Sequence, residues 1–374
     1  MRIKEIKLIN FRNYSKLQLD FCKNYNIIYG KNAQGKTNIL EAIFLCSSGR
    51  SHRTSKDNEL IKFMEDSYFV KIILEKKHTD SIIEIYYKRD ERKRIKINEV
   101  PIKKNGELMG QLNTVIFSPE DLSIIKDGPL ERRRFIDIAL SQLKPTYFYD
   151  LQQYSRILTQ RNHLLKSINK GTNKKNSLRD TLEIWNEKLV EIGSRIILER
   201  GKYLSGLNEK AGENHHRLTG STEEIQIVYS PSILVEKLDD VNNIRKAFME
   251  KIETSEEREI KNGVTLFGPQ RDDMEIRINN KNVRIYGSQG QQRTAVLTLK
   301  LSEIEILKEF LGEYPILLLD DVFSELDSVR QNYIIESLDN IQAFITTTEK
   351  VLYGNIRENN RRLYFVENGM VKAE

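Results

Sequence analysis

The feature that most constrains this chain is a glycine-bounded loop that lies between a predicted strand and a predicted helix. Residues 30–37 read GKNAQGKT, which matches the spacing of a phosphate-binding Walker A loop. Residues 26–29 have the character of a short buried strand, and residues 38–45 carry apolar side chains at helical spacing. This order of elements predicts a nucleoside triphosphate site at the helix N-terminus. The alternative is a glycine turn beside an exposed lysine.

The residue types of the loop fit the chemistry of ATP and Mg²⁺. Gly30 and Gly35 let the backbone bend so that its N–H groups face the phosphates. Lys36 brings a positive charge to the phosphates and is a candidate catalytic residue, and Thr37 offers its hydroxyl to Mg²⁺. We expect ATP contacts from the whole loop, which consists of Gly30, Lys31, Asn32, Ala33, Gln34, Gly35, Lys36 and Thr37.

An acidic motif follows far downstream. Residues 316–319 are four consecutive apolar residues, as in a parallel strand that is covered on both faces. Asp320 and Asp321 come directly after it, at the sheet edge where ligands bind in α/β folds. We expect Asp320 to hold Mg²⁺ and Asp321 to act in catalysis by positioning the attacking water. The alternative is an acidic pair that caps the next helix, near residues 324–327.

These motifs belong to a longer ordered set. In chain order the set comprises residues 10–14 (NFRNY), 30–37 (GKNAQGKT), 51–54 (SHRT), 117–122 (FSPEDL), 268–273 (GPQRDD), 288–293 (SQGQQR), 320–321 (DD) and 324–327 (SELD). The order and spacing resemble the ATP-binding-cassette superfamily, its DNA-repair branch with the SMC-like proteins, and most closely the RecF family. The resemblance covers essentially the whole chain.

The resemblance implies that ATP lies between two protomers of a homodimer. Ser288 and the backbone at Gly290 of one protomer would contact the γ-phosphate held by Lys36 of the other. A helix N-terminus with a hydroxyl and free N–H groups suits an anion, although a simple glycine-containing helix cap would read the same. The ATP contacts that the motifs add to the loop are Arg12, Asn13, Ser288, Gly290, Gln291 and Asp327.

Two departures from the wider superfamily bear on the mechanism. Residues 346–348 are all threonine, at the place after strand 343–345 where many cassette ATPases carry a switch histidine. Residues 119–121 (PED) replace the usual glutamine loop. Asp321 is also one methylene shorter than the glutamate common elsewhere, so it should reach the attacking water less well. We therefore expect slow hydrolysis, with ATP acting mainly as a dimerisation switch.

The predicted fold is α/β with α+β elements: an ABC-type P-loop ATPase head with an inserted helical domain. The head comprises residues 1–112 and 264–374, and the insert comprises residues 113–263. Within the insert, residues 178–203 carry an apolar stripe with four-three spacing, and residues 151–168 carry a similar one. Joined by a polar turn at residues 169–176, they predict a short antiparallel arm of about 45 Å. Local core packing explains the stripes equally well.

The overall composition fits this class. The chain has 374 residues, 39% hydrophobic residues and a net charge of +6. It has no apolar stretch near the ~20 residues that span a bilayer, and its first residues begin a predicted strand. Two cysteines do not make a disulfide framework. We therefore expect a cytoplasmic protein.

Basic residues gather in clusters that suit a phosphate backbone, which attracts positive charge without base specificity. Such runs are more often solvated surface, so each cluster is only a candidate. The candidate DNA contacts are Arg92, Arg94, Lys103, Lys104, Arg132, Arg133, Lys174 and Lys175.

The resemblance implies an ATP-dependent clamp of recombinational repair and replication restart. It would dimerise on duplex DNA near gaps or ss/ds junctions, and slow, weak DNA-stimulated ATP hydrolysis would reset it. A RecR-like mediator, and RecO as a further partner, would help to load the recombinase onto single strands. The alternative is an ATPase subunit of another machine, such as a transporter or a nuclease. A P-loop kinase would leave the motif at residues 288–293 without a role.

Overall fold

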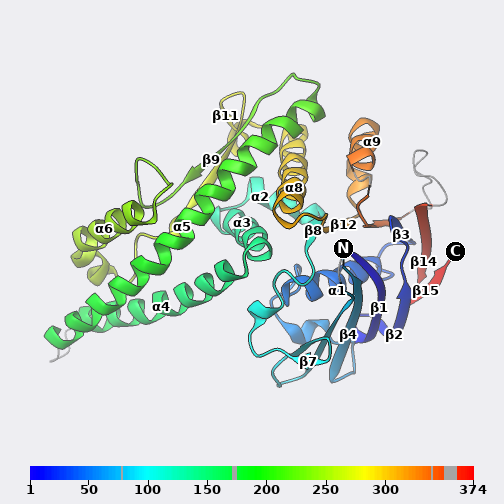
Figure 1. Cartoon of the computed structure of the whole chain (residues 1–374), viewed down its shortest axis with the longest axis horizontal. Coiled ribbons are helices and arrows are strands. Elements are labelled where there is room, and N and C mark those ends of the chain that lie inside the picture. The colour runs from blue at the N-terminus through cyan, green and yellow to red at the C-terminus, as the bar shows by residue number, and fades with distance from the viewer. Residues whose placement is uncertain (77–78, 171–174, 338–339, 349–359) are drawn as a thin grey trace. The chain divides into compact units, whose positions relative to one another are not determined.

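The chain forms two compact units in the computed structural model, which describes residues 1–374 except 77–78, 171–174, 338–339 and 349–359 (Figure 1). The sheet unit comprises Met1–Leu122 and Leu297–Glu374, and the helical unit comprises Ser123–Val296. Helix α8 (Gln289–Leu311) passes along the chain from the helical unit into the sheet unit. The predicted insert, residues 113–263, has different bounds from the helical unit, and that division into domains stays a prediction.

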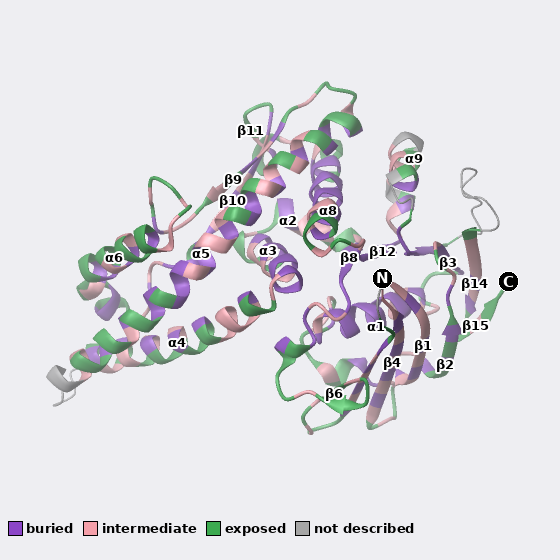
Figure 2. Cartoon of the chain, viewed as in Figure 1, coloured by how far each residue is buried: buried purple, intermediate pink, exposed green. Residues whose placement is uncertain are grey.

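A largely parallel six-stranded sheet forms one part of the sheet unit, in the order β15-β14-β3-β13-β12-β8. Its strands are β3 (Tyr25–Tyr29), β8 (Thr114–Phe117), β12 (Ile316–Asp320), β13 (Ala343–Thr347), β14 (Arg361–Glu367) and β15 (Met370–Ala373). All residues of β3, β8, β12 and β13 are buried, which explains their mostly apolar sequences (Figure 2). Because β3, β13 and β12 are parallel neighbours, the residues that follow them converge on one sheet edge.

An antiparallel sheet forms the other part of the sheet unit, in the order β2-β1-β4-β5-β6-β7. Its strands are β1 (Arg2–Phe11), β2 (Tyr14–Asp20), β4 (Ser67–Glu75), β5 (Ser81–Lys88), β6 (Arg94–Ile97) and β7 (Val100–Pro101). Residues alternate between buried and partly exposed along β4 and β5, because one face covers the core. The helices of this unit are α1 (Lys36–Ser48), α9 (Ser328–Ser337) and the 3₁₀ turns η1 (Asp57–Leu60), η2 (Asn105–Glu107), η3 (Pro119–Leu122) and η5 (Val322–Glu325).

The helical unit contains the predicted pair of arm helices, α4 (Pro145–Asn169) and α5 (Lys175–Thr219), which lie side by side (Figure 1). Asp150 pairs with Arg195 at 2.8 Å and Arg161 bonds to Asn186 at 2.7 Å, so the two helices run antiparallel. The predicted apolar stripe on the second helix is confirmed, since its members are buried at Leu182, Leu189, Ile192, Ile196 and Tyr203. Residues 171–174 of the predicted turn lie outside the described residues.

The rest of the helical unit packs around these helices. Its helices are α2 (Ser123–Lys126), α3 (Pro129–Leu143), α6 (Val241–Asn262) and α7 (Val283–Tyr286), with the 3₁₀ turn η4 (Pro269–Arg271). A three-stranded antiparallel sheet consists of β9 (Ile225–Ser230), β10 (Asp273–Ile278) and β11 (Lys281–Asn282). The mixture of helices and strands in the two units confirms the predicted fold class. Among the described residues, no helix has the length and apolar character that crossing a membrane requires.

Candidate nucleotide-binding site

The loop at residues 30–37 connects β3 to α1, as predicted. Gly30 (φ 149°) and Gly35 (φ 111°) both have backbone conformations that suit glycine. A Cβ atom at Gly30 would lie 2.3 Å from the carbonyl oxygen of Val366, so a larger residue cannot fit without moving β14. The Lys36 ammonium donates to the carbonyls of Gly30 at 2.7 Å and Lys31 at 2.9 Å. Burial lowers the pKa of Lys36, and the nearby Asp321 and Asp320 act in the opposite direction.

The acidic pair lies beside this loop. Thr37 Oγ1 at the start of α1 donates to Asp320 Oδ1 at 2.8 Å, and Thr346 Oγ1 on β13 donates to the same oxygen at 2.7 Å. The Asp321 N–H donates to Thr346 Oγ1 at 2.9 Å. Burial raises the pKa of Asp320, and the two threonine hydrogen bonds oppose this rise. The Thr346 hydroxyl therefore bonds to both acidic residues. Thr346 stands at the position where many cassette ATPases carry a switch histidine.

Asp321 takes a left-handed conformation (φ 53°) that aspartate tolerates better than most residues. It precedes η5, but its side chain makes no capping hydrogen bond there. The structure therefore contradicts, for Asp321, the alternative in which the acidic pair caps the next helix. Asp327 does cap a helix, because its Oδ1 accepts the Arg330 N–H at 2.9 Å at the start of α9.

The turn between β1 and β2 supports the loop from the side. Asn13 Nδ2 donates to the carbonyl of Gln34 at 2.8 Å, and the Tyr14 hydroxyl donates to the carbonyl of Gly35 at 3.0 Å. Asn38 on α1 donates to Asn13 Oδ1 at 2.8 Å, which fixes the orientation of the Asn13 amide. Asn13 thus contacts the loop itself, next to the expected phosphate position.

Arg12 is engaged by a buried carboxylate that the sequence analysis did not single out. Its guanidinium donates to both oxygens of Glu41 at 2.8 and 2.7 Å, and to the carbonyl of Glu59 at 2.9 Å. Burial alone would raise the pKa of Glu41, but hydrogen bonds from Arg12 and Ser51 lower it. In the structure Arg12 therefore holds α1, and its contact with ATP stays a prediction. A signal was present, because Glu41 interrupts the apolar face of helix 38–45.

The motif at residues 288–293 lies in the helical unit, at the start of α8. The Ser288 N–H donates to Gln291 Oε1 at 3.0 Å, and the Gln291 N–H donates to Ser288 Oγ at 3.2 Å. Ser288, Gln289 and Gly290 are exposed. The loop at residues 30–37 belongs to the other compact unit.

Comparison with known proteins places this geometry in a family. A family model described as RecF/RecN/SMC N terminal domain matches residues 2–372. The DNA replication and repair protein RecF of Acetivibrio thermocellus is 50% identical over 369 residues, which are 99% of each chain. That of Ruminiclostridium cellulolyticum is 49% identical over 374 residues, which are 100% of each chain.

The chain belongs to the RecF family.

Solved structures agree with this assignment. The recombination mediator protein RecF with ATP, described as part of the RecFOR pathway, has a TM-score of 0.92 and 42% identity, and the match covers 100% of this chain and 97% of that one. The ATPrS form has a TM-score of 0.91, 43% identity, and coverage of 100% and 98%. A Smc head from Pyrococcus furiosus matches at 17% identity with a TM-score of 0.55, which concerns the fold alone. The comparisons thus confirm the predicted SMC-like ATPase head and the RecF family of DNA replication and repair proteins. They favour this assignment over the alternative of a transporter or nuclease subunit.

The basic candidates of this RecF-family chain differ in accessibility. Arg92 is exposed, and no hydrogen bond or ion pair engages it among the described residues. Arg94 is exposed but paired with Glu91 at 2.8 Å, and Lys103 and Lys104 are exposed. Lys174 and the side chain of Lys175 lie outside the described part of the chain.

The structure contradicts the expectation that Arg132 is a surface contact for DNA. Its side chain is buried and donates to both oxygens of Asp273 at 2.6 and 2.9 Å. Arg133 is partly buried and donates to the carbonyl of Asp272 at 2.7 Å. A run of three arginines on a helix turns its members to different faces, which the run itself does not reveal. Arg132 therefore belongs to the interior of the helical unit, where it is bonded to Asp273.

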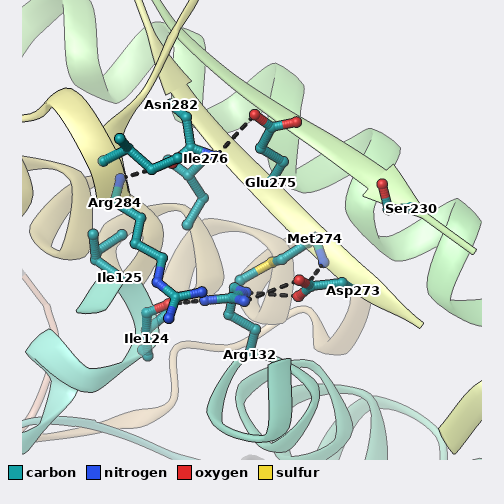
Figure 3. Close-up of a pocket in the computed structure, with 11 residues that line it drawn as sticks. Ile124, Ile125, Arg132, Ser230, Asp273, Met274, Glu275, Ile276, Asn282 and Arg284 are labelled. Atoms are coloured by element: carbon teal, nitrogen blue, oxygen red, sulfur yellow. Dashed lines mark hydrogen bonds and ion pairs between the residues drawn. The ribbon is translucent and has the colours of Figure 1, made fainter. Parts of the chain in front are cut away.

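The Arg132–Asp273 pair lines a cavity of about 410 Å³ in the helical unit (Figure 3). Met274 and Ile276 contribute apolar walls, and Asn282 bonds to Glu275 at 2.9 Å. Both carboxylates of the wall are thus already bonded to protein donors. This arrangement explains why a charged pair is tolerated here.

Proposed function

We propose that this chain is an ATP-dependent DNA clamp of recombinational repair and replication restart. The 2.8 Å contact between Thr37 and Asp320 carries the proposal. Two oxygen ligands that meet beside a phosphate-binding loop fit a Mg²⁺ ion, which takes few protein ligands and keeps water and phosphate oxygens. ATP as the nucleotide is supported by the solved relative described as RecF-ATP.

The proposed ATP contacts are the loop at residues 30–37 and the neighbouring Asn13, with Arg12 close by. Lys36 is proposed to turn from the loop carbonyls to the phosphates and to neutralise charge as the γ-phosphate leaves. Asp321 is proposed to orient the attacking water, because the Thr346 hydrogen bond fixes its backbone. Mg²⁺, held by Thr37 and Asp320, would supply charge neutralisation at the phosphates.

The ATP site is proposed to be completed by a second copy of the chain. Ser288 and Gly290 are exposed at the N-terminus of α8, where N–H groups suit a phosphate. Gln291 would hold Ser288 in place, and Asp327 would lie close to the interface. Hydrolysis is proposed to be slow and weakly stimulated by DNA, since Asp321 is short and no histidine stands at Thr346.

The proposed substrate of the clamp is duplex DNA near gaps or ss/ds junctions. Of the basic candidates, Arg92, Arg94, Lys103 and Lys104 are exposed and fit a sequence-independent phosphate contact. The RecFOR pathway named for solved relatives supports partners of the RecR and RecO kind, which would help to load the recombinase. This work would take place in the cytoplasm.

Mixing two defective variants tests the proposal. Lys36→Met removes the charge of the phosphate loop, and Ser288→Arg blocks the motif at the start of α8. Each variant alone should lose ATP-dependent dimerisation and ATP-enhanced duplex binding. A mixture should regain one intact site per dimer and about half of the wild-type hydrolysis per dimer. No regain in a demonstrably mixed dimer would count against shared sites, and salt-insensitive duplex binding would count against the clamp.

A further inference from the structure

A chain of polar contacts within the helical unit connects the end of α5 to the turn at Ser288. His215 lies near the C-terminal end of α5, and Glu223 lies in the loop between α5 and β9. His215 Nε2 lies 3.4 Å from Glu223 Oε2, and Gln291 Nε2 donates to Glu223 Oε1 at 2.8 Å. The other end of the same amide, Gln291 Oε1, accepts the Ser288 N–H at 3.0 Å.

Glu223 determines the orientation of the Gln291 amide. An ionised carboxylate only accepts hydrogen bonds, so the amide NH₂ group must face Glu223 and the amide oxygen must face Ser288. A reversed amide would place two donors against each other at Ser288 and two acceptors against each other at Glu223. Because Gln291 also donates its backbone N–H to Ser288 Oγ, the N–H and the hydroxyl of Ser288 both depend on Gln291.

The loop that carries Glu223 is itself held at both ends. The Ser221 N–H donates to the carbonyl of His216 at 2.9 Å, at the end of α5. On the other side, the Glu224 N–H donates to Asn279 Oδ1 at 2.9 Å, and the Asn279 N–H donates to the carbonyl of Glu224 at 2.9 Å. Glu223 is 22% exposed and His215 is fully buried, so water weakens their contacts only in part.

We propose that Glu223 is a positioning residue for Ser288, and that it ties the geometry of the α8 N-terminus to the end of α5. The inference rests on the proposed function, in which Ser288 and Gly290 contact ATP held by a second protomer. Glu223 acts through Gln291 and touches no nucleotide. Its loss lets the Gln291 amide rotate, so the α8 N-terminus presents its donors in a poorer geometry to the partner. ATP binding to the protomer's own loop is unaffected.

Three variants test this positioning role. Glu223→Ala removes the carboxylate, Glu223→Gln keeps an acceptor for Gln291 Nε2, and Glu224→Ala changes the adjacent exposed carboxylate as a matched control. Sedimentation with Mg·ATP measures dimerisation, and fluorescent ATP analogue titration at dilute protein measures binding to the monomer. Glu223→Ala should weaken dimerisation about 10- to 100-fold, as expected when a hydrogen bond to a charged group is lost. Glu223→Gln and Glu224→Ala should remain within about threefold of wild type.

A mixing experiment separates positioning from general damage. Glu223→Ala with Lys36→Met should regain ATP-dependent dimerisation, because one site combines two intact halves. Equal dimerisation by wild type and Glu223→Ala would overturn this inference but not the proposed function. Loss of monomer ATP binding or of thermal stability in Glu223→Ala would also overturn it, since the residue would then be structural. If wild type itself did not dimerise with ATP, the proposed function and the inference would both fail.

Discussion

Thr346 offers the most direct test of how the acidic pair works. Its hydroxyl donates to Asp320 Oδ1 at 2.7 Å and accepts the Asp321 N–H at 2.9 Å, and its side chain is buried. Thr346→Val keeps the shape of the side chain and removes both hydrogen bonds. ATP binding should persist because Lys36 and the loop backbone are unchanged, whereas hydrolysis should slow.

The size of the effect follows from the two bonds that are lost. A hydrogen bond to a charged group contributes about 1.5–3 kcal/mol, and a buried N–H without a partner costs about 1–3 kcal/mol. The hydrogen bond from the Asp321 N–H is only partly buried, and Thr37 still donates to Asp320, so we take about half of the summed cost of the two losses. A rise in the barrier of about 1.5–3 kcal/mol corresponds to a rate that is about 10- to 100-fold lower.

Single-turnover hydrolysis with saturating duplex DNA measures this change, with ATP affinity measured in parallel. Thr347→Val is the matched control, because Thr347 is buried on the same strand and its side chain makes no hydrogen bond within the described residues. Thr346→Ser keeps the hydroxyl and should restore most of the rate. A Thr346→Val enzyme that hydrolyses ATP at the wild-type rate would refute the reasoning, as would one that no longer binds ATP.

Two further predictions concern α8 and α7. Burial raises the pKa of Glu303 to about 7, with Lys300 opposing and Asp121 assisting, so its folded pKa lies above the usual value of 4.5. The free energy of unfolding should therefore fall as pH rises from about 5 to 7. Glu303→Gln should be more stable than wild type by about 1–3 kcal/mol at pH 8, which urea unfolding measures. The same pH dependence of the unfolding free energy in wild type and Glu303→Gln would contradict this. Tyr286 is 70% exposed beside the Ser288 turn, so Tyr286→Ser should weaken ATP-dependent dimerisation about 10-fold. Leu234→Ser, 85% exposed in the same unit, is the control and should change dimerisation little.

The parts that sequence predicted well depend on local patterns. The loop at residues 30–37 has its glycines, strand and helix within a short segment, and the apolar run 316–319 needs a covered parallel strand wherever it lies. The stripes of α4 and α5 follow from helical spacing alone.

The parts that sequence missed depend on partners far away in the chain. Arg12 pairs with Glu41, and Arg132 pairs with Asp273, which lies on a strand far downstream. A basic residue has the same appearance in a sequence whether it faces water or a buried carboxylate, so its role needs the fold. In the sequence, Thr346 indicates only that a switch histidine is absent, because its two hydrogen bonds require β12 and β13 to be neighbours.

The two halves of the proposed ATP site differ in how much of their geometry is complete within one protomer. Thr37 and Thr346 donate hydrogen bonds to Asp320, and Lys36 donates to the loop carbonyls. The catalytic half is therefore ordered by its own unit. A threonine at position 346 does not titrate near neutral pH, unlike a histidine, so it holds the acidic pair without taking part in proton transfer. The Ser288 turn is equally ordered, through Glu223 and Gln291, yet Ser288, Gln289 and Gly290 are exposed. If each half of the site is ordered before ATP binds, the step left for ATP to control is the association of the two halves. A clamp requires this kind of control, in which association sets the timing.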